Sequence, residues 1–140
     1  MKSIITRLGP VLVWAIVILL ASSIPRPLDV YPSGIIATLR ELRVLGTEGI
    51  NLASFLIHFL LYGMLGFLAG RALTGDGPFT TRLFLVGLVL CTLFGFLDEL
   101  YQISVPGRAF EWIDVLANGL GSAVGLGVFW SRKKVIGRRK

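Results

Sequence analysis

Residues 97–118 read Leu-Asp-Glu-Leu-Tyr-Gln-Ile-Ser-Val-Pro-Gly-Arg-Ala-Phe-Glu-Trp-Ile-Asp-Val-Leu-Ala-Asn, and long apolar runs lie on both sides of this stretch. Its most unusual side chains in such surroundings are Asp98, Glu99, Gln102, Arg108, Asp114 and Asn118. Charge in apolar surroundings is costly unless it is paired, and inside membranes it usually serves a function. The stretch therefore predicts a polar site set into an otherwise apolar fold.

The composition is typical of an integral membrane protein. Of the 140 residues, 54% are hydrophobic and only 16% are charged, against about 25% charged residues in soluble domains. The mean hydropathy is +0.79. The length predicts one domain, residues 1–140, with no second one. The single cysteine, Cys91, excludes an intramolecular disulfide and a metal–thiolate cluster.

Four runs are apolar and long enough to cross a membrane as helices, at about residues 8–24, 51–71, 82–103 and 111–130. The fold class we predict is all-α, a bundle of four transmembrane helices. The first run has the position of a secretory signal, but its apolar part exceeds the usual 7–15 residues, so we expect a retained span.

The segment between the first two runs has a helical pattern of its own. Ile35, Ile36, Leu39 and Leu42 recur at helical spacing, with charged residues on the other faces. This pattern predicts a short amphipathic helix in the membrane interface. A loop helix packed on the bundle fits the pattern equally well.

The third and fourth spans are too short without their acidic ends. Leu83 to Leu97 gives 15 uncharged residues, or roughly 22 Å of helix, whereas the hydrocarbon core is about 30 Å thick. We therefore expect Asp98 and Glu99 to lie inside the membrane. The fourth run, Val115 to Ser131, has 17 uncharged residues, which places Asp114 just inside the boundary.

Basic residues predict the orientation. With four spans, the amino terminus, the turn at 71–82 and the carboxyl terminus share one side and hold ten Lys and Arg, against four on the other side. The positive-inside rule then places both termini in the cytoplasm. Six of the ten lie in the last nine residues, a pattern typical of an anchor on anionic lipid, and we expect no nucleic-acid partner.

This orientation gathers the unusual polar side chains in the outer half of the bundle. They form a predicted ligand-binding pocket of Ser22, Ser23, His58, Tyr62, Asp98, Glu99, Gln102, Arg108, Asp114 and Asn118. Such a pocket suits the headgroup of an amphiphile, with Arg108 holding a phosphate or carboxylate. A transporter with only four spans is expected to work as a homodimer.

Two other interpretations of the same residues stay open. A structural network would tie the helices together, although three acids facing one arginine do not balance in charge. A membrane enzyme acting on a lipid-linked substrate would use the acids and His58 as acid–base or metal groups. Hard oxygen ligands make a metal chemically possible, but no paired-histidine spacing supports it, so we expect no metal and no other cofactor.

The ordered set of polar residues resembles the VanZ-like family over roughly residues 8–130. The matching positions are Ser22 or Ser23, His58, Tyr62, Asp98, Glu99, Gln102, Arg108, Asp114, Asn118, Gly121 and Gly125. The family pattern has a Lys shortly before the His, and here Ser54 stands near that place. The resemblance implies a multi-pass protein of the bacterial inner (cytoplasmic) membrane that is linked to the cell envelope.

The family is associated with low-level resistance to teicoplanin, a glycopeptide antibiotic that carries a lipid. Together with the pocket, the resemblance leads us to expect a protein that binds an amphiphile: a membrane lipid, a lipid-linked envelope precursor or a lipoglycopeptide. Moving or modifying this ligand would extend the same role, and a structural scaffold is the remaining alternative.

Overall fold

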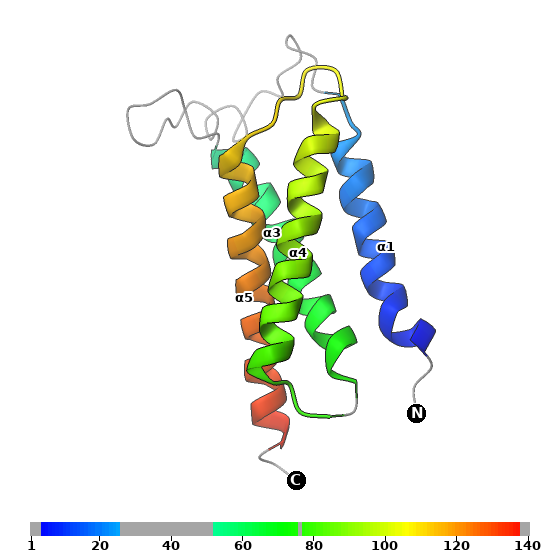
Figure 1. The fold of residues 1–140 in the computed structure, drawn as a ribbon, viewed down its shortest axis with the longest axis vertical. Helices are drawn as coiled ribbons and strands as arrows, with labels where there is room; N and C mark the ends of the chain where they lie inside the picture. The colour runs from blue at the N-terminus through cyan, green and yellow to red at the C-terminus, as the bar shows by residue number, and fades with distance from the viewer. Residues whose placement is uncertain (1–3, 26–51, 76, 138–140) are drawn as a thin grey trace.

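The computed structural model describes residues 4–25, 52–75 and 77–137. Four helices run through them, and no strand is present in these ranges: α1 (Ile4–Ser22), α3 (Leu52–Thr74), α4 (Thr81–Gln102) and α5 (Trp112–Gly137). The helices lie side by side as a bundle (Figure 1). The all-α fold class is thus confirmed, whereas the predicted interfacial helix falls on residues outside the described ranges.

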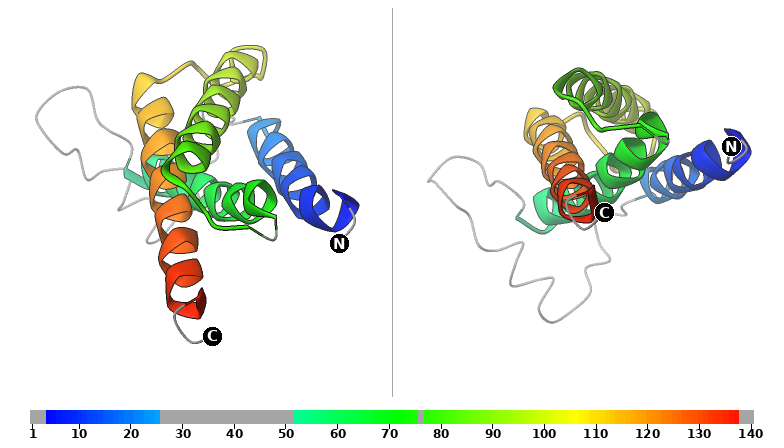
Figure 2. Two further views of the ribbon diagram at one scale, coloured as in Figure 1. Left: turned by 60° about the horizontal axis from the view of Figure 1, so that its bottom comes forward. Right: turned by 90° about the horizontal axis from the view of Figure 1, so that it is seen from below.

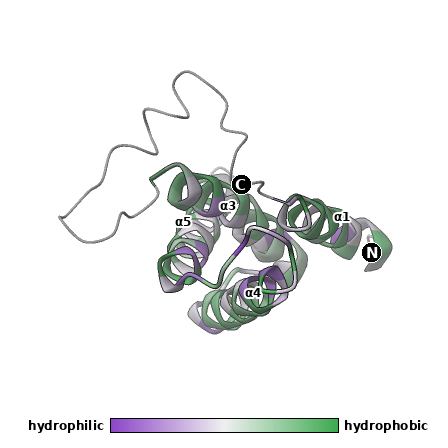
Figure 3. Ribbon diagram, turned by 90° about the horizontal axis from the view of Figure 1, so that it is seen from above, coloured by the Kyte–Doolittle hydropathy of each residue, from purple (hydrophilic) through white to green (hydrophobic). Residues whose placement is uncertain are grey.

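Each of the four helices is long and apolar enough to cross a membrane. Large apolar side chains stand exposed on the outward faces, such as Leu12 and Ile16 on α1, Leu60 on α3 and Val89 on α4. Apolar residues dominate these outer sides when the bundle is seen from its end (Figure 3). An exposed apolar surface of this extent is suited to lipid, so the chain is a multi-pass membrane protein.

The closest helix contact joins α3 and α5, where glycines let the two backbones meet. A Cβ atom built on Gly125 would collide with the carbonyl oxygen of Gly63, and one on Gly121 would collide with that of Phe59. Small residues at such crossings allow close approach in membranes, where van der Waals packing drives association. This contact fixes the position of the polar side chains on both helices.

Helix α1 lies at the edge of the bundle, beside α3 and away from α5, in both views of Figure 2. It is anchored near its middle, where Ile18 is buried and the Trp14 indole Nε1 donates to the Leu61 carbonyl oxygen at 2.8 Å. Most of its remaining surface is exposed apolar side chain. The position of α1 therefore depends on a few contacts with α3 and on those at its carboxyl end.

The observed ends differ from the predicted spans in two places. Helix α1 begins at Ile4 rather than near residue 8, and α5 continues to Gly137 rather than stopping near residue 130. Arg7 lies in the extension of α1, and Arg132 and two lysines lie in that of α5. Lys and Arg are strong helix formers, so these helices can continue past their apolar stretches. The other two helices keep the predicted bounds to within three residues.

The helix ends that carry the polar side chains lie together. The end of α1, the start of α3, the end of α4 and the start of α5 meet at one end of the bundle (Figure 1). Ile103 is the C-cap of α4, and Gly107 then takes a φ of 74° in the turn that leads to α5, a conformation that favours glycine. The start of α1 and the end of α5 lie at the opposite end.

Candidate functional site

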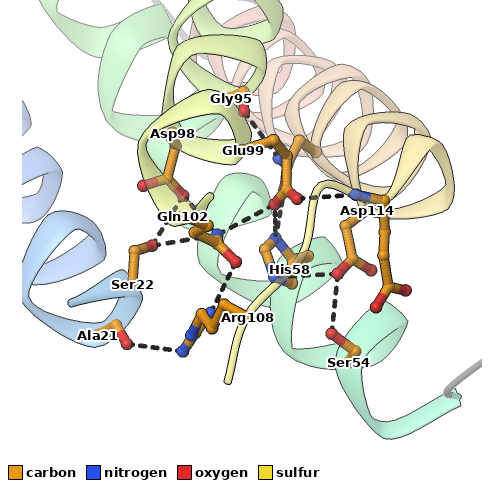
Figure 4. A network of polar contacts seen from close by, with 12 residues as sticks. Ala21, Ser22, Ser54, His58, Gly95, Asp98, Glu99, Gln102, Arg108 and Asp114 are labelled. Carbon is orange, nitrogen blue, oxygen red and sulfur yellow. Dashed lines mark hydrogen bonds and ion pairs between the residues drawn. The ribbon is translucent and has the colours of Figure 1, made fainter. Parts of the chain in front are cut away.

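A set of buried polar side chains from all four helices occupies the end of the bundle where α1 ends and α3 begins. We name it the polar cluster, and it consists of Ser22, Ser54, His58, Tyr62, Asp98, Glu99, Gln102, Arg108, Asp114 and Asn118. All but the half-buried Arg108 are buried. Figure 4 shows the polar contacts that connect most of them.

Both acids at the end of α4 face the interior. Adjacent residues on a helix point about 100° apart, so the sequence leaves open whether both face the bundle. Asp98 is 2% exposed and Glu99 is 0% exposed, because Asp98 meets α1 while Glu99 turns toward α3 and the start of α5. Both carboxylates lie within α4, the helix that contains the third predicted span, and their place inside the membrane stays a prediction.

One oxygen of Asp98 collects donors from three helices. Its Oδ2 accepts from the Ser22 hydroxyl at 2.8 Å, and from Tyr62 and Gln102 at 3.4 Å each. The other oxygen, Oδ1, is buried and has no hydrogen-bond partner within the part of the chain that the structure describes. The carboxylate is thus firmly positioned through one oxygen and unsatisfied at the other.

Gln102 links the acids to Arg108. Its amide nitrogen donates to Oε1 of Glu99 at 3.0 Å, and its amide oxygen accepts from Nη1 of Arg108 at 2.8 Å. The same guanidinium donates from Nη2 to the carbonyl oxygen of Ala21 at 2.9 Å and from Nε to that of Ile24 at 3.2 Å. A cation at the carboxyl end of a helix is stabilised by the carbonyls there, so Arg108 holds α1 against the turn after α4.

His58 lies between the other two acids. Its Nε2 is 3.4 Å from Oδ2 of Asp114, and its Nδ1 is 3.6 Å from Oε1 of Glu99 and 3.0 Å from Oδ1 of Asn118. The hydroxyl of Ser54 donates to the same Asp114 oxygen at 2.9 Å. Oδ1 of Asp114 is buried and, like that of Asp98, has no partner in the described residues.

The polar cluster carries more negative than positive charge. It contains three buried carboxylates and one guanidinium, and His58 is the only other titratable base in it. With all three carboxylates ionised and His58 neutral, the positive charge of Arg108 offsets one carboxylate, and two negative charges remain. Uncompensated charge is costly in a low-dielectric interior, so protons, a cation or a ligand must compensate it.

The structure brings together nine of the ten residues that the sequence predicts for the pocket and separates Ser23 from them. Ser23 is half-buried, and its hydroxyl donates to the Leu19 carbonyl oxygen at 2.6 Å and lies 3.0 Å from the Tyr101 hydroxyl, in contacts that are exposed. Ser54 joins the polar cluster although it is not among the pocket residues predicted from the sequence. Its spacing of four from His58, on the same face of α3, is the signal that could have identified it.

The geometry allows binding and proton exchange more readily than nucleophilic catalysis. A serine nucleophile needs its hydroxyl directed at a base, with the base oriented by a third group. Here the Ser22 hydroxyl donates to Asp98 and the Ser54 hydroxyl donates to Asp114, so both protons go to carboxylates. The groups that remain for chemistry are the three carboxylates and the imidazole.

Comparison with models of known protein families matches residues 8–134 to the family described as VanZ/LLP1. The match spans all four helices and every residue of the polar cluster. Neither the curated proteins nor the solved structures contain a match to this chain.

Proposed function

The chain belongs to the VanZ/LLP1 family, and we propose that it is a protein of the bacterial inner membrane that binds the headgroup of an amphiphile at the polar cluster. The ligand class is a membrane lipid, a lipid-linked envelope precursor or a lipid-bearing glycopeptide such as teicoplanin. The distribution of basic residues supports an orientation with both termini in the cytoplasm and the polar cluster in the outer half.

The observation that carries this proposal is the place of Arg108 at the rim of the polar cluster. Its guanidinium is half-buried, and among its acceptors are two neutral backbone oxygens, that of Ala21 in α1 and that of Ile24 just after it. A phosphate or carboxylate offers a guanidinium an oppositely charged acceptor that can take two parallel hydrogen bonds, whereas a backbone carbonyl is neutral and accepts through one oxygen. An anionic headgroup that reaches the rim can therefore replace the carbonyls of Ala21 and Ile24 as the acceptor.

The surroundings of Arg108 suit an amphiphile more than a soluble anion. Its acceptors Ala21 and Ile24 are accompanied in the chain by exposed apolar side chains, Leu20 and Ile24 itself, and Ile103 is exposed just after α4. A lipid tail would keep contact with such surfaces while the headgroup meets the guanidinium. The excess negative charge behind Arg108 favours a ligand that also carries hydroxyl or ammonium donors.

A purely structural role fits the polar cluster less well. Buried polar groups in a structural network are expected to be paired, because each unpaired one is costly. The unpaired Oδ1 atoms of Asp98 and Asp114 depart from that expectation. They point to a proton, a cation or a ligand donor as the missing partner.

Native mass spectrometry of the protein released from mild detergent micelles tests the proposal. The parent chain, Arg108→Ala and the matched control Arg82→Ala would each be titrated with phosphatidylglycerol as the anionic probe lipid. We expect one lipid to stay bound to the parent and to the control, whose exposed arginine lies at the opposite end, and to be lost from Arg108→Ala. Equal lipid retention by all three proteins would overturn the role of Arg108.

A further inference from the structure

We propose that His58, Glu99 and Asp114 form a binding site for one divalent transition-metal ion inside the bundle. The three residues come from α3, α4 and α5, and each is at least 95% buried. This inference departs from the sequence-based expectation of no metal, and nothing in the family match assigns a metal to these positions. The inference goes beyond the headgroup proposal, because it requires no ligand at Arg108.

The ligand atoms are close enough to share an ion. One ligand atom from each residue can be chosen so that all three lie within 4.8 Å of one another. His58 Nε2 and Asp114 Oδ2 are 3.4 Å apart. Two ligands at about 2.0–2.2 Å from a tetrahedral Zn²⁺ are separated by about 3.3–3.6 Å, so this pair already has the required spacing. Glu99 Oε1 lies 3.6 Å from the other ring nitrogen, Nδ1, so its carboxylate must move toward Nε2 to complete the set.

Asn118 orients the imidazole as a metal-binding histidine requires. Its amide nitrogen lies 3.5 Å from the Gly95 carbonyl oxygen, which turns Oδ1 toward Nδ1 of His58 at 3.0 Å. Nδ1 then carries the proton and donates it to Asn118. The lone pair of Nε2 faces the Asp114 carboxylate, so a positive species is needed between them. Metal-bound histidines commonly donate their second ring nitrogen in this way.

The unsatisfied oxygen of Asp114 is a second, independent indication of a ligand. The side chain is only 4% exposed, yet Oδ1 has no hydrogen-bond partner in the described residues. Figure 4 shows the Asp114 carboxylate directed at the His58 ring. A buried carboxylate oxygen without a donor is costly, and a cation bound by both oxygens of Asp114 would supply the partner that Oδ1 lacks.

A divalent ion also balances the charge. Two negative charges remain in the polar cluster after Arg108 is counted against one carboxylate, with His58 neutral. One divalent cation cancels both and leaves the interior neutral, which a low-dielectric site between membrane helices favours. Two protons would achieve the same balance, so only a direct measurement of metal binding distinguishes a metal from protons.

The ligand set indicates the class of metal. One imidazole nitrogen and two carboxylates suit Zn²⁺, Mn²⁺, Fe²⁺ or Co²⁺, whereas Mg²⁺ and Ca²⁺ prefer oxygen ligands alone. Three protein ligands leave a fourth position open for water or for an oxygen atom of a headgroup. The site would thus present a Lewis acid next to the rim where Arg108 lies.

Cobalt titration of the full-length chain tests this inference. The protein would be purified without a histidine tag, treated with a chelator, and titrated with Co²⁺ while the visible absorption of tetrahedral cobalt is measured. The parent chain is expected to bind one Co²⁺, and Zn²⁺ is expected to displace it. Asn118→Ala, which removes only the orienting partner, is expected to weaken binding by about 10–100-fold.

His58→Gln and Asp114→Asn are expected to abolish the cobalt absorption. Cys91→Ala is the matched control, because it removes the only thiol of the chain without touching the three ligands, and it is expected to bind Co²⁺ like the parent. Circular dichroism confirms that each variant keeps its helices. Absence of Co²⁺ binding by the folded parent, or equal binding by His58→Gln, would overturn the metal site and favour protons. Neither result would affect lipid binding at Arg108, which the mass spectrometry measures separately.

Discussion

The hydroxyl of Ser22 donates to Oδ2 of Asp98 at 2.8 Å, which joins the end of α1 to the end of α4 across 76 residues of sequence. This bond is buried, whereas the hydrogen bonds of the neighbouring, half-buried Ser23 are exposed. The two adjacent serines therefore offer a direct test of what a buried polar contact contributes in this bundle.

Replacing Ser22 by alanine should destabilise the bundle by about 1 kcal/mol. The change removes the shortest of the hydrogen bonds to Asp98, and single hydrogen bonds between membrane helices contribute about 0.6 kcal/mol on average, with a maximum near 1.7 kcal/mol. The free energy of unfolding in mixed detergent micelles, measured by titration with a denaturing detergent, checks this value. Ser23→Ala is the control, with an expected change below about 0.5 kcal/mol because the hydrogen bonds of this half-buried serine are exposed.

Span length and helical spacing predicted much of the polar cluster. The third run was too short without Asp98 and Glu99, and this physical requirement placed both acids inside the helix. The spacing of four between His58 and Tyr62 placed these side chains on one face of α3, and both are buried in the polar cluster. Periodicity and membrane thickness act locally, so one sequence suffices to apply them.

The pairing within the polar cluster could not be predicted in the same way. The choice between Ser22 and Ser23 depends on the rotation of α1 about its axis, which is set by tertiary packing around Ile18. The bonds from Arg108 to Gln102 and to the carbonyls of Ala21 and Ile24 depend on the path of the turn around Gly107. Both are properties of the assembled helices rather than of any one segment.

The contact between α3 and α5 predicts a difference between two glycines of α5. Gly125→Ala should destabilise the protein by about 1–3 kcal/mol, because the new methyl group would collide with the Gly63 carbonyl oxygen and force the helices apart. Gly127→Ala meets no atom within 4 Å, and the higher helix propensity of alanine should make it neutral or stabilising by up to about 1 kcal/mol.

Thermal unfolding in the same detergent, followed by helical circular dichroism, compares the two glycine variants with the parent. If the two variants unfolded at the same temperature, the close contact between the α3 and α5 backbones at Gly125 would be contradicted.

Arg108 should protect the end of α1 from opening. In Arg108→Ala the carbonyls of Ala21 and Ile24 lose their charged donor, so we expect faster hydrogen–deuterium exchange at the amides of Ser23 and Ile24. Arg108→Lys should restore protection only in part, since one ammonium cannot reproduce the planar fork of the guanidinium. Unchanged exchange at these amides in Arg108→Ala would contradict an anchoring role.

The orientation of the bundle yields the last prediction. The turn after α4 should face the outside and the turn between α3 and α4 the cytoplasm. The side that holds the α3–α4 turn and both termini carries ten basic residues, and the other side carries four. In a Cys91→Ala background, Ser104→Cys should react in intact cells with a maleimide that cannot cross the membrane. Gly77→Cys should react only after the membrane is permeabilised, because both positions are exposed but lie at opposite ends of the bundle. The reverse labelling pattern would place the polar cluster on the cytoplasmic side, where a headgroup of the inner leaflet would be the ligand.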